Sequence, residues 1–206
     1  MWFQTSRPEI PKQPNLLVPC PNAARKSGDN LGAYVPNPAH TSPLAMEQLE
    51  MVGKFMGISL RFKASLPFAF PSIVWKPLVG GQMRHDDLLS MDTLYGQYIH
   101  AIRHCDRDFT LENEPHDPIT SDAQFAEAFP GLTFTTNDTN GDEVELLPGG
   151  SAMPVTFSNR HRFCDLVEQF RLHEFDDQVA AMKRGLSTIV PIRSLTLFTA
   201  GEVEVL

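Results

Sequence analysis

The segment that decides the fold is MDTLYGQYIHAIRHC, residues 91–105. Asp92 is typical of a helix N-cap, because its short side chain can accept a hydrogen bond from a free backbone N–H. We therefore expect a helix from about Thr93 to His104. Two apolar stripes follow it at i, i+4, i+7 spacing: Tyr95, Ile99 and Ile102, and then Leu94, Tyr98 and Ala101. One stripe is enough to dock a helix, so either both sides are buried, the favoured interpretation, or one stripe is a binding surface.

Upstream of this segment, the sequence predicts two more helices and a strand. Ser42-Pro43 begins a helix whose apolar residues recur at helical spacing up to Leu60. Gly53 and Gly57 lie four apart in it, which predicts the close approach of a neighbouring element. A second helix is expected through residues 73–75, started by Pro71 and disturbed by Pro77. Residues 16–18 form a short apolar strand.

Downstream, turn and cap signals divide the chain into short elements. We expect a short helix at 121–129 and a hairpin from 132–135 to 144–146, turning at Asn140-Gly141. Thr156 caps a helix with an apolar stripe, and a further helix from about Asp176 ends at Gly185. A capping box at 199–202 opens a last helix that Leu206 cuts short, which predicts that the sequence is a piece of a longer protein.

The composition excludes several classes of protein. The 206 residues carry a net charge of −8, which argues against a nucleic-acid binder because phosphate contacts need a basic surface. No run of 18 apolar residues predicts a membrane span, and no secretory signal is recognisable. Three scattered cysteines predict a reduced, intracellular protein.

Candidate chemistry is sparse. His100 and His104, four apart on one helical face, resemble metal ligands, and Cys105 lies next to them in the sequence. However, no second cluster completes a site, and surface histidines are the expected interpretation. Cys105 and Cys164 are candidate nucleophiles, but packed cysteines are the favoured interpretation. Phosphate-binding and nucleophile-elbow motifs are missing from the sequence. By elimination, a binding surface remains.

Six segments in order carry a resemblance to a known family. They are FMGISL (55–60), MDTLY (91–95), LLPGG (146–150), VTFSNR (155–160), QVAAMKRG (178–185) and LFTAGEVE (197–204). Together they resemble the N-terminal lobe of the HECT domain of ubiquitin ligases. Residues 154–160 and 172–174 are most similar to the giant ligases of the RCC1-repeat-containing (HERC-type) branch.

The resemblance implies a two-lobed transferase. Its N-terminal lobe docks a ubiquitin-conjugating enzyme loaded with ubiquitin, and a cysteine of the C-terminal lobe accepts ubiquitin as a thioester and passes it to a lysine of a protein substrate. That cysteine would lie beyond Leu206, so Cys20, Cys105 and Cys164 inherit no catalytic role and the fragment alone should be inactive. The family implies no cofactor and no metal, and a location in the cytoplasm, with the nucleus as a second place.

The resemblance also implies a groove for the conjugating enzyme. One wall would come from the helix of residues 94–104 and the other from the helix after Thr156. The expected contact residues are Leu94, Gln97, Tyr98, Ala101, Phe163 and Val167, with Phe163 as an aromatic anchor. Ala101 stands where many members have a larger apolar residue and Val167 where several have an aromatic one; residues 105–130 do not align with compact members. These differences bear on the choice of partner.

We therefore predict an α+β fold, mainly helical, with a small hairpin-containing subdomain. The larger subdomain would comprise about residues 1–90 and 175–206, and the smaller, which binds the conjugating enzyme, about residues 91–174. Two alternatives stay open. One is a non-catalytic adaptor that retains the fold, and the other is a metal-binding module at His100, His104 and Cys105.

Overall fold

The computed structural model describes residues 15–62, 68–111, 114–197, 199 and 201. The fold is α+β and mainly helical, as predicted. The helices are α1 (Pro21–Arg25), α2 (Pro43–Phe62), α3 (Ser72–Val79), α4 (His85–Met91), α5 (Thr93–Arg103), α6 (Asp122–Ala128), α7 (Arg160–His173), α8 (Asp176–Ser187) and α9 (Ile192–Leu195). In this described part of the chain, no helix has both the length and the apolar character that crossing a membrane requires.

Among the described residues, the strands form three two-stranded antiparallel sheets. They pair β1 (Leu17–Pro19) with β2 (Tyr34–Pro36), β3 (Phe109–Leu111) with β4 (Glu114–His116), and β5 (Thr135–Asn137) with β6 (Glu143–Glu145). A short 3-10 turn, η1 (Gly150–Ala152), follows β6. The pairing of β1 with β2, which are separated in the chain by α1, confirms the predicted strand at residues 16–18 within one residue. The β3–β4 hairpin was not predicted, because residues 105–130 show no clear alternation of apolar and polar side chains.

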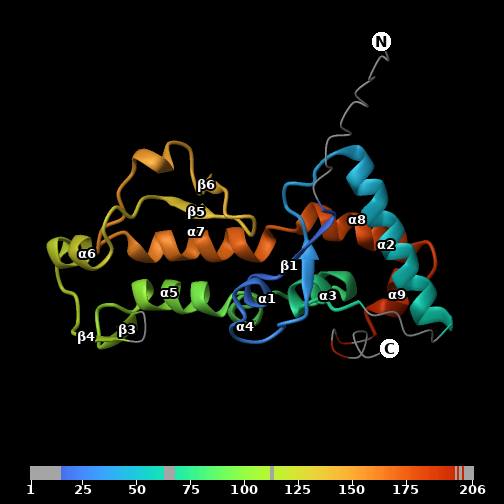
Figure 1. The fold of residues 1–206 in the computed structure, drawn as a ribbon, viewed down its shortest axis with the longest axis horizontal. Helices are drawn as coiled ribbons and strands as arrows, with labels where there is room; N and C mark the ends of the chain where they lie inside the picture. Colours follow the sequence, from blue (N-terminus) through green and yellow to red (C-terminus); the bar gives the residue numbers. More distant parts are fainter. Residues whose placement is uncertain (1–14, 63–67, 112–113, 198, 200, 202–206) are drawn as a thin grey trace, which may run out of the picture.

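The molecule is elongated, and its apolar side chains form two clusters. At one end, α2, α3, α8 and α9 surround the first cluster; toward the other end, α5 and α7 lie side by side, with β5–β6 over α7 and α6 beyond them (Figure 1). The first cluster takes its residues from 16–91 and 172–195, and the second from 95–167. The predicted division of the chain into two subdomains, with bounds near residues 90 and 175, stays a prediction. The presence of two separate clusters favours it.

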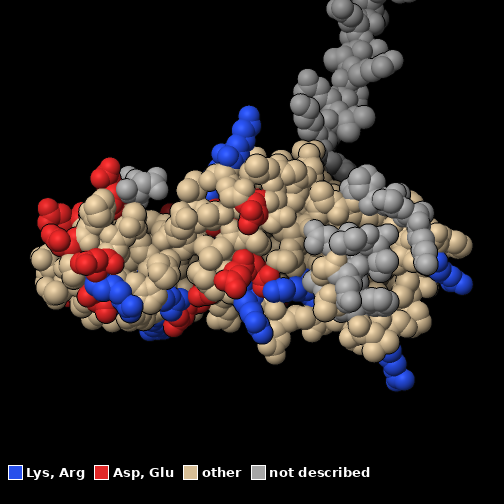
Figure 2. Space-filling model, turned by 90° about the horizontal axis from the view of Figure 1, so that it is seen from below, with Lys and Arg blue, Asp and Glu red and all other residues tan. Residues whose placement is uncertain are grey.

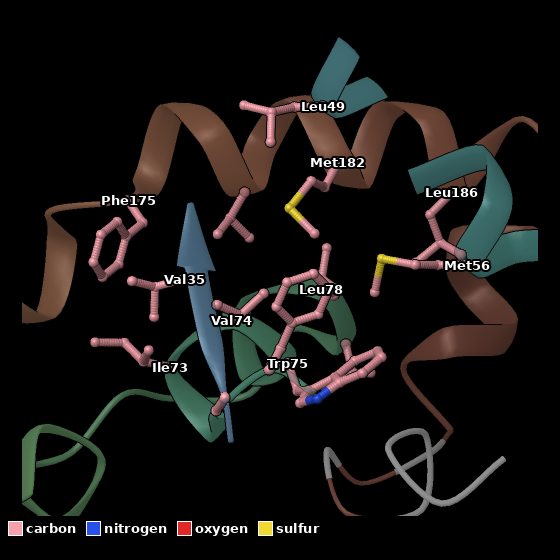
Figure 3. Close-up of a cluster of buried hydrophobic side chains, with 14 of the residues drawn as sticks. Val35, Leu49, Met56, Ile73, Val74, Trp75, Leu78, Phe175, Met182 and Leu186 are labelled. Carbon is pink, nitrogen blue, oxygen red and sulfur yellow. The ribbon is translucent and has the colours of Figure 1, made fainter. Parts of the chain in front are cut away.

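The first cluster depends on an unusually close contact between α2 and α8. Side chains of both helices converge on α3 and β2 in its interior (Figure 3). A Cβ atom on Gly53 would lie 1.8 Å from the carbonyl oxygen of Met182, and one on Gly185 would lie 1.8 Å from that of Glu50. The close approach predicted from Gly53 and Gly57 is therefore confirmed. The prediction that Gly185 ends its helix is wrong, because α8 continues to Ser187 and Gly185 is buried within it.

Local cap signals are mostly confirmed. The Ala45 N–H donates to Ser42 Oγ at 3.2 Å at the start of α2, and the Tyr95 N–H donates to Asp92 Oδ1 at 3.2 Å at the start of α5. Ser121 caps α6 in the same way. Pro77 lies inside α3, which nonetheless runs on to its C-cap at Gly80. The predicted capping box at 199–202 includes residues outside the described part of the chain.

Two boundaries differ from the prediction. Helix α7 begins at Arg160 after an N-cap at Asn159, and Thr156 instead donates its N–H to Asn159 Oδ1 at 2.8 Å. The connection between β5 and β6 is a longer loop than Asn140-Gly141 alone. In that loop the Asp138 carboxylate accepts hydrogen bonds from the N–H groups of Asn140 and Asp142, so an Asx-type turn replaces the two-residue one.

Candidate functional site

The predicted site is built on α5 and α7, and buried charges fix the start of α5. The Asp92 carboxylate, which caps α5, also accepts a hydrogen bond from Arg171 Nη2 at 3.3 Å. Arg25 forms a second ion pair with Asp92. Arg171, near the end of α7, also binds Glu174 Oε2 at 2.8 Å. The start of α5 is therefore tied to the end of α7 by charge-assisted hydrogen bonds.

Three of the six predicted contact residues face solvent or lie at its edge. Leu94 is 48% exposed, Gln97 is exposed and Tyr98 is half-buried. The Tyr98 ring packs edge-on against Phe129, with centroids 6.0 Å apart and planes at 75°. This packing fixes the aromatic body of Tyr98 against the protein, so the outer face of α5 offers a rigid surface with Leu94 as its exposed apolar residue.

The other three predicted contact residues lie in the second cluster. Ala101, Phe163 and Val167 are all buried. The Phe163 ring packs edge-on against Phe134, with centroids 5.8 Å apart. The expected role of Phe163 as an anchor that a partner touches therefore does not agree with this packing. In this conformation, these three side chains hold α5, α7 and the β5–β6 hairpin together beneath the exposed face.

Charged side chains lock α5 to α7 on another side of the pair. Arg103 of α5 donates to Asp165 Oδ1 at 2.5 Å and to Glu168 Oε2 at 2.9 Å, both on α7. These carboxylates raise the pKa of Arg103, although burial acts in the opposite direction. His85 Nδ1 lies 3.0 Å from Glu168 Oε1 and extends this group to α4. The two walls of the predicted groove are thus held at a fixed spacing.

Acidic side chains gather at the end of the molecule that carries α6 and the β3–β4 hairpin (Figure 2). The exposed carboxylates of this acidic end include Asp108, Glu114, Asp117, Asp122 and Glu127. Their negative potential favours the approach of a partner with a basic surface.

The histidines and cysteines of the sequence analysis do not converge on a reactive site. The rings of His100 and His104 lie 4.4 Å apart between centroids. Burial, and then the charges of His100, Arg107 and Arg103, lower the pKa of His104. Among the described residues, no group of three or more His, Cys, Asp or Glu side chains is arranged to hold a metal ion.

All three cysteines are buried and free. Burial raises the pKa of Cys164 to about 12, and burial likewise raises the pKa of Cys105. The Cys164 thiol lies 3.6 Å from the carbonyl oxygen of Ile99. Since the thiolate is the nucleophile, neither environment suits catalysis, and packing explains both residues.

Two features of the site had no signal in the sequence. The Tyr95 hydroxyl is hydrogen-bonded to the Thr136 hydroxyl, and the Arg171 guanidinium lies 5.4 Å from the centre of the Tyr95 ring. Phe129, the neighbour of Tyr98, comes from the polar region that suggested no contact. All of these pairs are far apart in the chain, so local spacing could not reveal them.

The geometry therefore describes a small helical subdomain with a rigid outer face, and comparison with known proteins gives its class. The chain belongs to the HECT-domain (ubiquitin-transferase) family, whose pattern matches residues 9–206. It is 31% identical over 92% of its length to E3 ubiquitin-protein ligase HERC2 of Mus musculus and of Homo sapiens. This similarity confirms the predicted resemblance to a HECT N-terminal lobe of the HERC-type branch.

More distant relatives are also named E3 ubiquitin-protein ligases. The chain is 26% identical over its whole length to E3 ubiquitin-protein ligase HACE1 of Homo sapiens, and 23% identical over 86% of its length to E3 ubiquitin-protein ligase RSP5 of Emericella nidulans. It spans 4% of the length of HERC2 and 20% of the length of these two ligases. The comparison thus concerns one part of much longer proteins.

Proposed function

We propose that this chain is the lobe of a HECT ubiquitin ligase that docks a ubiquitin-loaded conjugating enzyme, through the outer face of α5. The observation that carries the proposal is the position of Leu94. It is a large apolar side chain, half exposed, on a helix whose other large apolar side chains are buried or partly buried. Leu94, Gln97 and Tyr98 form the surface that the partner touches, whereas Ala101, Phe163 and Val167 position it from below.

The transfer itself uses a cysteine outside these residues. That thiolate attacks the carbonyl carbon of the ubiquitin thioester on the conjugating enzyme, and the thiolate of that enzyme leaves. A lysine amine of the protein substrate then attacks the new thioester and forms an amide bond. The buried cysteines of this chain, with their raised pKa values, take no part in either step. The fragment alone binds and positions but transfers nothing.

The acidic end of the molecule supports fast association with a basic partner. Its exposed carboxylates belong to the same subdomain as α5, so long-range attraction would raise the rate of encounter. Contacts of this kind are screened by salt, with a Debye length of about 8 Å at physiological ionic strength. We expect the association rate to fall between low and physiological salt while the dissociation rate changes little.

A binding titration against a panel of ubiquitin-conjugating enzymes tests the proposal. Leu94→Asp should weaken binding at least about tenfold, because a charge would replace the apolar contact. Leu44→Asp is a matched control, since Leu44 is 50% exposed and is also the second residue of its helix, but on α2. Equal binding by Leu94→Asp and the wild type, with unchanged circular dichroism, would place the docking surface elsewhere.

A further inference from the structure

The solvent-facing side of α2 carries large apolar side chains from its first turn to its last. Half of the large hydrophobic side chains that the described residues expose belong to this one helix, so the exposure is concentrated rather than scattered. They are Leu44, Met51, Phe55, Ile58 and Phe62, between 38% and 68% exposed. We call these five residues the α2 stripe. The opposite side of α2 is already buried against α8, so the helix has two apolar faces and the fold uses one of them.

The spacing of the α2 stripe is that of a coiled-coil seam. Positions 44, 48, 51, 55, 58 and 62 alternate in steps of four and three, which is the 3.5-residue period at which one helix packs along another. Gln48 is the polar member of this series. The side chains of a strand repeat every two residues and those of an irregular peptide have no fixed period, so neither would match this spacing. The occupant that fits the face is therefore a second helix.

Charges beside the α2 stripe indicate which helix it is. Glu47 and Arg61 lie along the same edge of the stripe, near its two ends, and both are exposed. Lys54, between them, is paired with Glu50 at 3.2 Å. Within the described residues neither Glu47 nor Arg61 forms an ion pair. A helix with opposite charges at its two ends is complementary to a copy of itself that runs in the opposite direction.

We propose that α2 is a self-association surface on which two copies of this chain pair through antiparallel α2 helices. A two-fold axis near the middle of the helix places Leu44 of one copy against Phe62 of the other, and Met51 against Phe55. The same axis brings Glu47 of each copy to Arg61 of the other. The layers of Leu44 with Phe62 and of Met51 with Phe55 then combine one aliphatic side chain with one aromatic side chain, and Gln48 meets Ile58 between them. A parallel pair would instead stack Phe55 on Phe55 and Phe62 on Phe62.

The position of α2 allows this pairing. The helix lies at the edge of the molecule, at the end opposite α6 (Figure 1). Its 20 residues give a seam of about 30 Å at 1.5 Å per residue. The outer face of α5 lies over the second cluster and stays exposed in the pair. This inference therefore does not depend on the docking function proposed above.

Sedimentation equilibrium over a range of protein concentrations tests the pairing. The wild-type chain of 23.0 kDa should convert to a species of twice that mass as its concentration rises. Phe55→Asp should raise the dissociation constant at least about tenfold, because a charge would enter the centre of the seam. Leu94→Asp is the control and should dimerise as the wild type does. A wild-type chain that stays monomeric up to millimolar concentration, or a Phe55→Asp chain that dimerises equally well, would overturn the proposal.

Exchange of the flanking charges tests the antiparallel register without touching the apolar residues. Glu47→Arg and Arg61→Glu should each weaken dimerisation, because each brings like charges together at both ends of the pair. The double variant restores both attractions and should return the dissociation constant to within about twofold of the wild type. A double variant as weak as its single parents would show that the two helices do not pair in this register.

Discussion

Arg171 and Asp92 form an ion pair in the interior of the protein, with 3.3 Å between Nη2 and Oδ2 and only 2% and 3% of the side chains exposed. Arg171 stands at the end of α7, and Asp92 caps α5. Arg171 also binds Glu174, which accepts a hydrogen bond from the Thr139 N–H at 2.6 Å. The group therefore connects α5, α7 and the β5–β6 hairpin at the junction of the two hydrophobic clusters.

Replacing Arg171 with methionine tests how much this group contributes. The Asp92 and Glu174 carboxylates would lose a buried cation, and burial already raises the pKa of Glu174. We expect Arg171→Met to lower the free energy of unfolding by about 3–5 kcal/mol, as for other buried pairs that lose one partner. Urea denaturation at pH 7, followed by circular dichroism, measures this.

Arg184→Met is the matched control for that experiment. Arg184 pairs with Glu50 on the surface at 3.8 Å, and its side chain is 58% exposed. Its replacement should cost less than about 1 kcal/mol, because exposed pairs are screened by solvent. Similar losses for both variants would mean that the buried pair contributes no more than a surface one.

The contact between α2 and α8 gives a second prediction, on Gly53. Alanine favours a helix over glycine by about 1 kcal/mol, so an unobstructed Gly53→Ala would stabilise α2. Here the new methyl group would collide with the backbone of Met182, which cannot move aside as a side chain can. We expect Gly53→Ala to destabilise the protein by about 1–3 kcal/mol or more. The midpoint of urea denaturation measures the change.

Gly32→Ala distinguishes this collision from a general effect of losing a glycine. A Cβ atom at Gly32 would meet no atom within 4 Å, and its φ is not positive. The unfolding free energy of the Gly32→Ala variant should equal that of the wild type or exceed it by up to about 1 kcal/mol. If Gly53→Ala were as stable as Gly32→Ala, the two helices would not need to approach as closely as they do here.

Local signals predicted the fold where the physical cause is local. A cap depends on a side chain and an N–H three residues away, so Ser42 and Asp92 were recognisable from the sequence. Gly185 was misread for the opposite reason. A glycine after an amphipathic segment is typical of a helix end, but this one is required by the carbonyl of Glu50, which is distant in the chain.

The two helices that carry the candidate site were predictable, but their exposed surface was not. The two stripes of α5 and the stripe of α7 are readable from their spacing. Which side chains remain outside depends on what covers them: Phe134 packs on Phe163, and Phe129 packs on one side of Tyr98. These aromatic partners come from the hairpin and from α6, whose placement over α5 and α7 has no local signal.

The buried Cys164 thiol gives a prediction for alkaline pH. Burial raises its pKa from 9.0 to about 12, so between these values the unfolded chain loses a proton that the folded chain keeps. Stability is therefore unaffected below pH 9 and falls above it, by up to about 1.4 kcal/mol per pH unit for one group. Denaturation of the wild type and of Cys164→Ala at pH 8 and pH 10 should show a steeper fall for the wild type. An identical fall in both would assign the alkaline loss to other groups.

Substitutions of Phe163 test whether this residue belongs to the core or contacts the partner. The Phe163 ring is buried and packs on Phe134, so Phe163→Ala should lower the free energy of unfolding by about 3–5 kcal/mol. Any loss of docking in that variant would follow from the loss of the fold. Phe163→Leu fills most of the space, so we expect it to stay folded and to bind conjugating enzyme within about threefold of the wild type. Titrations of Phe163→Leu and Leu94→Asp side by side, with unfolding free energies for both, measure this. If Phe163→Leu instead lost binding while remaining stably folded, Phe163 itself would contact the partner, and the second cluster would have to open when the partner docks.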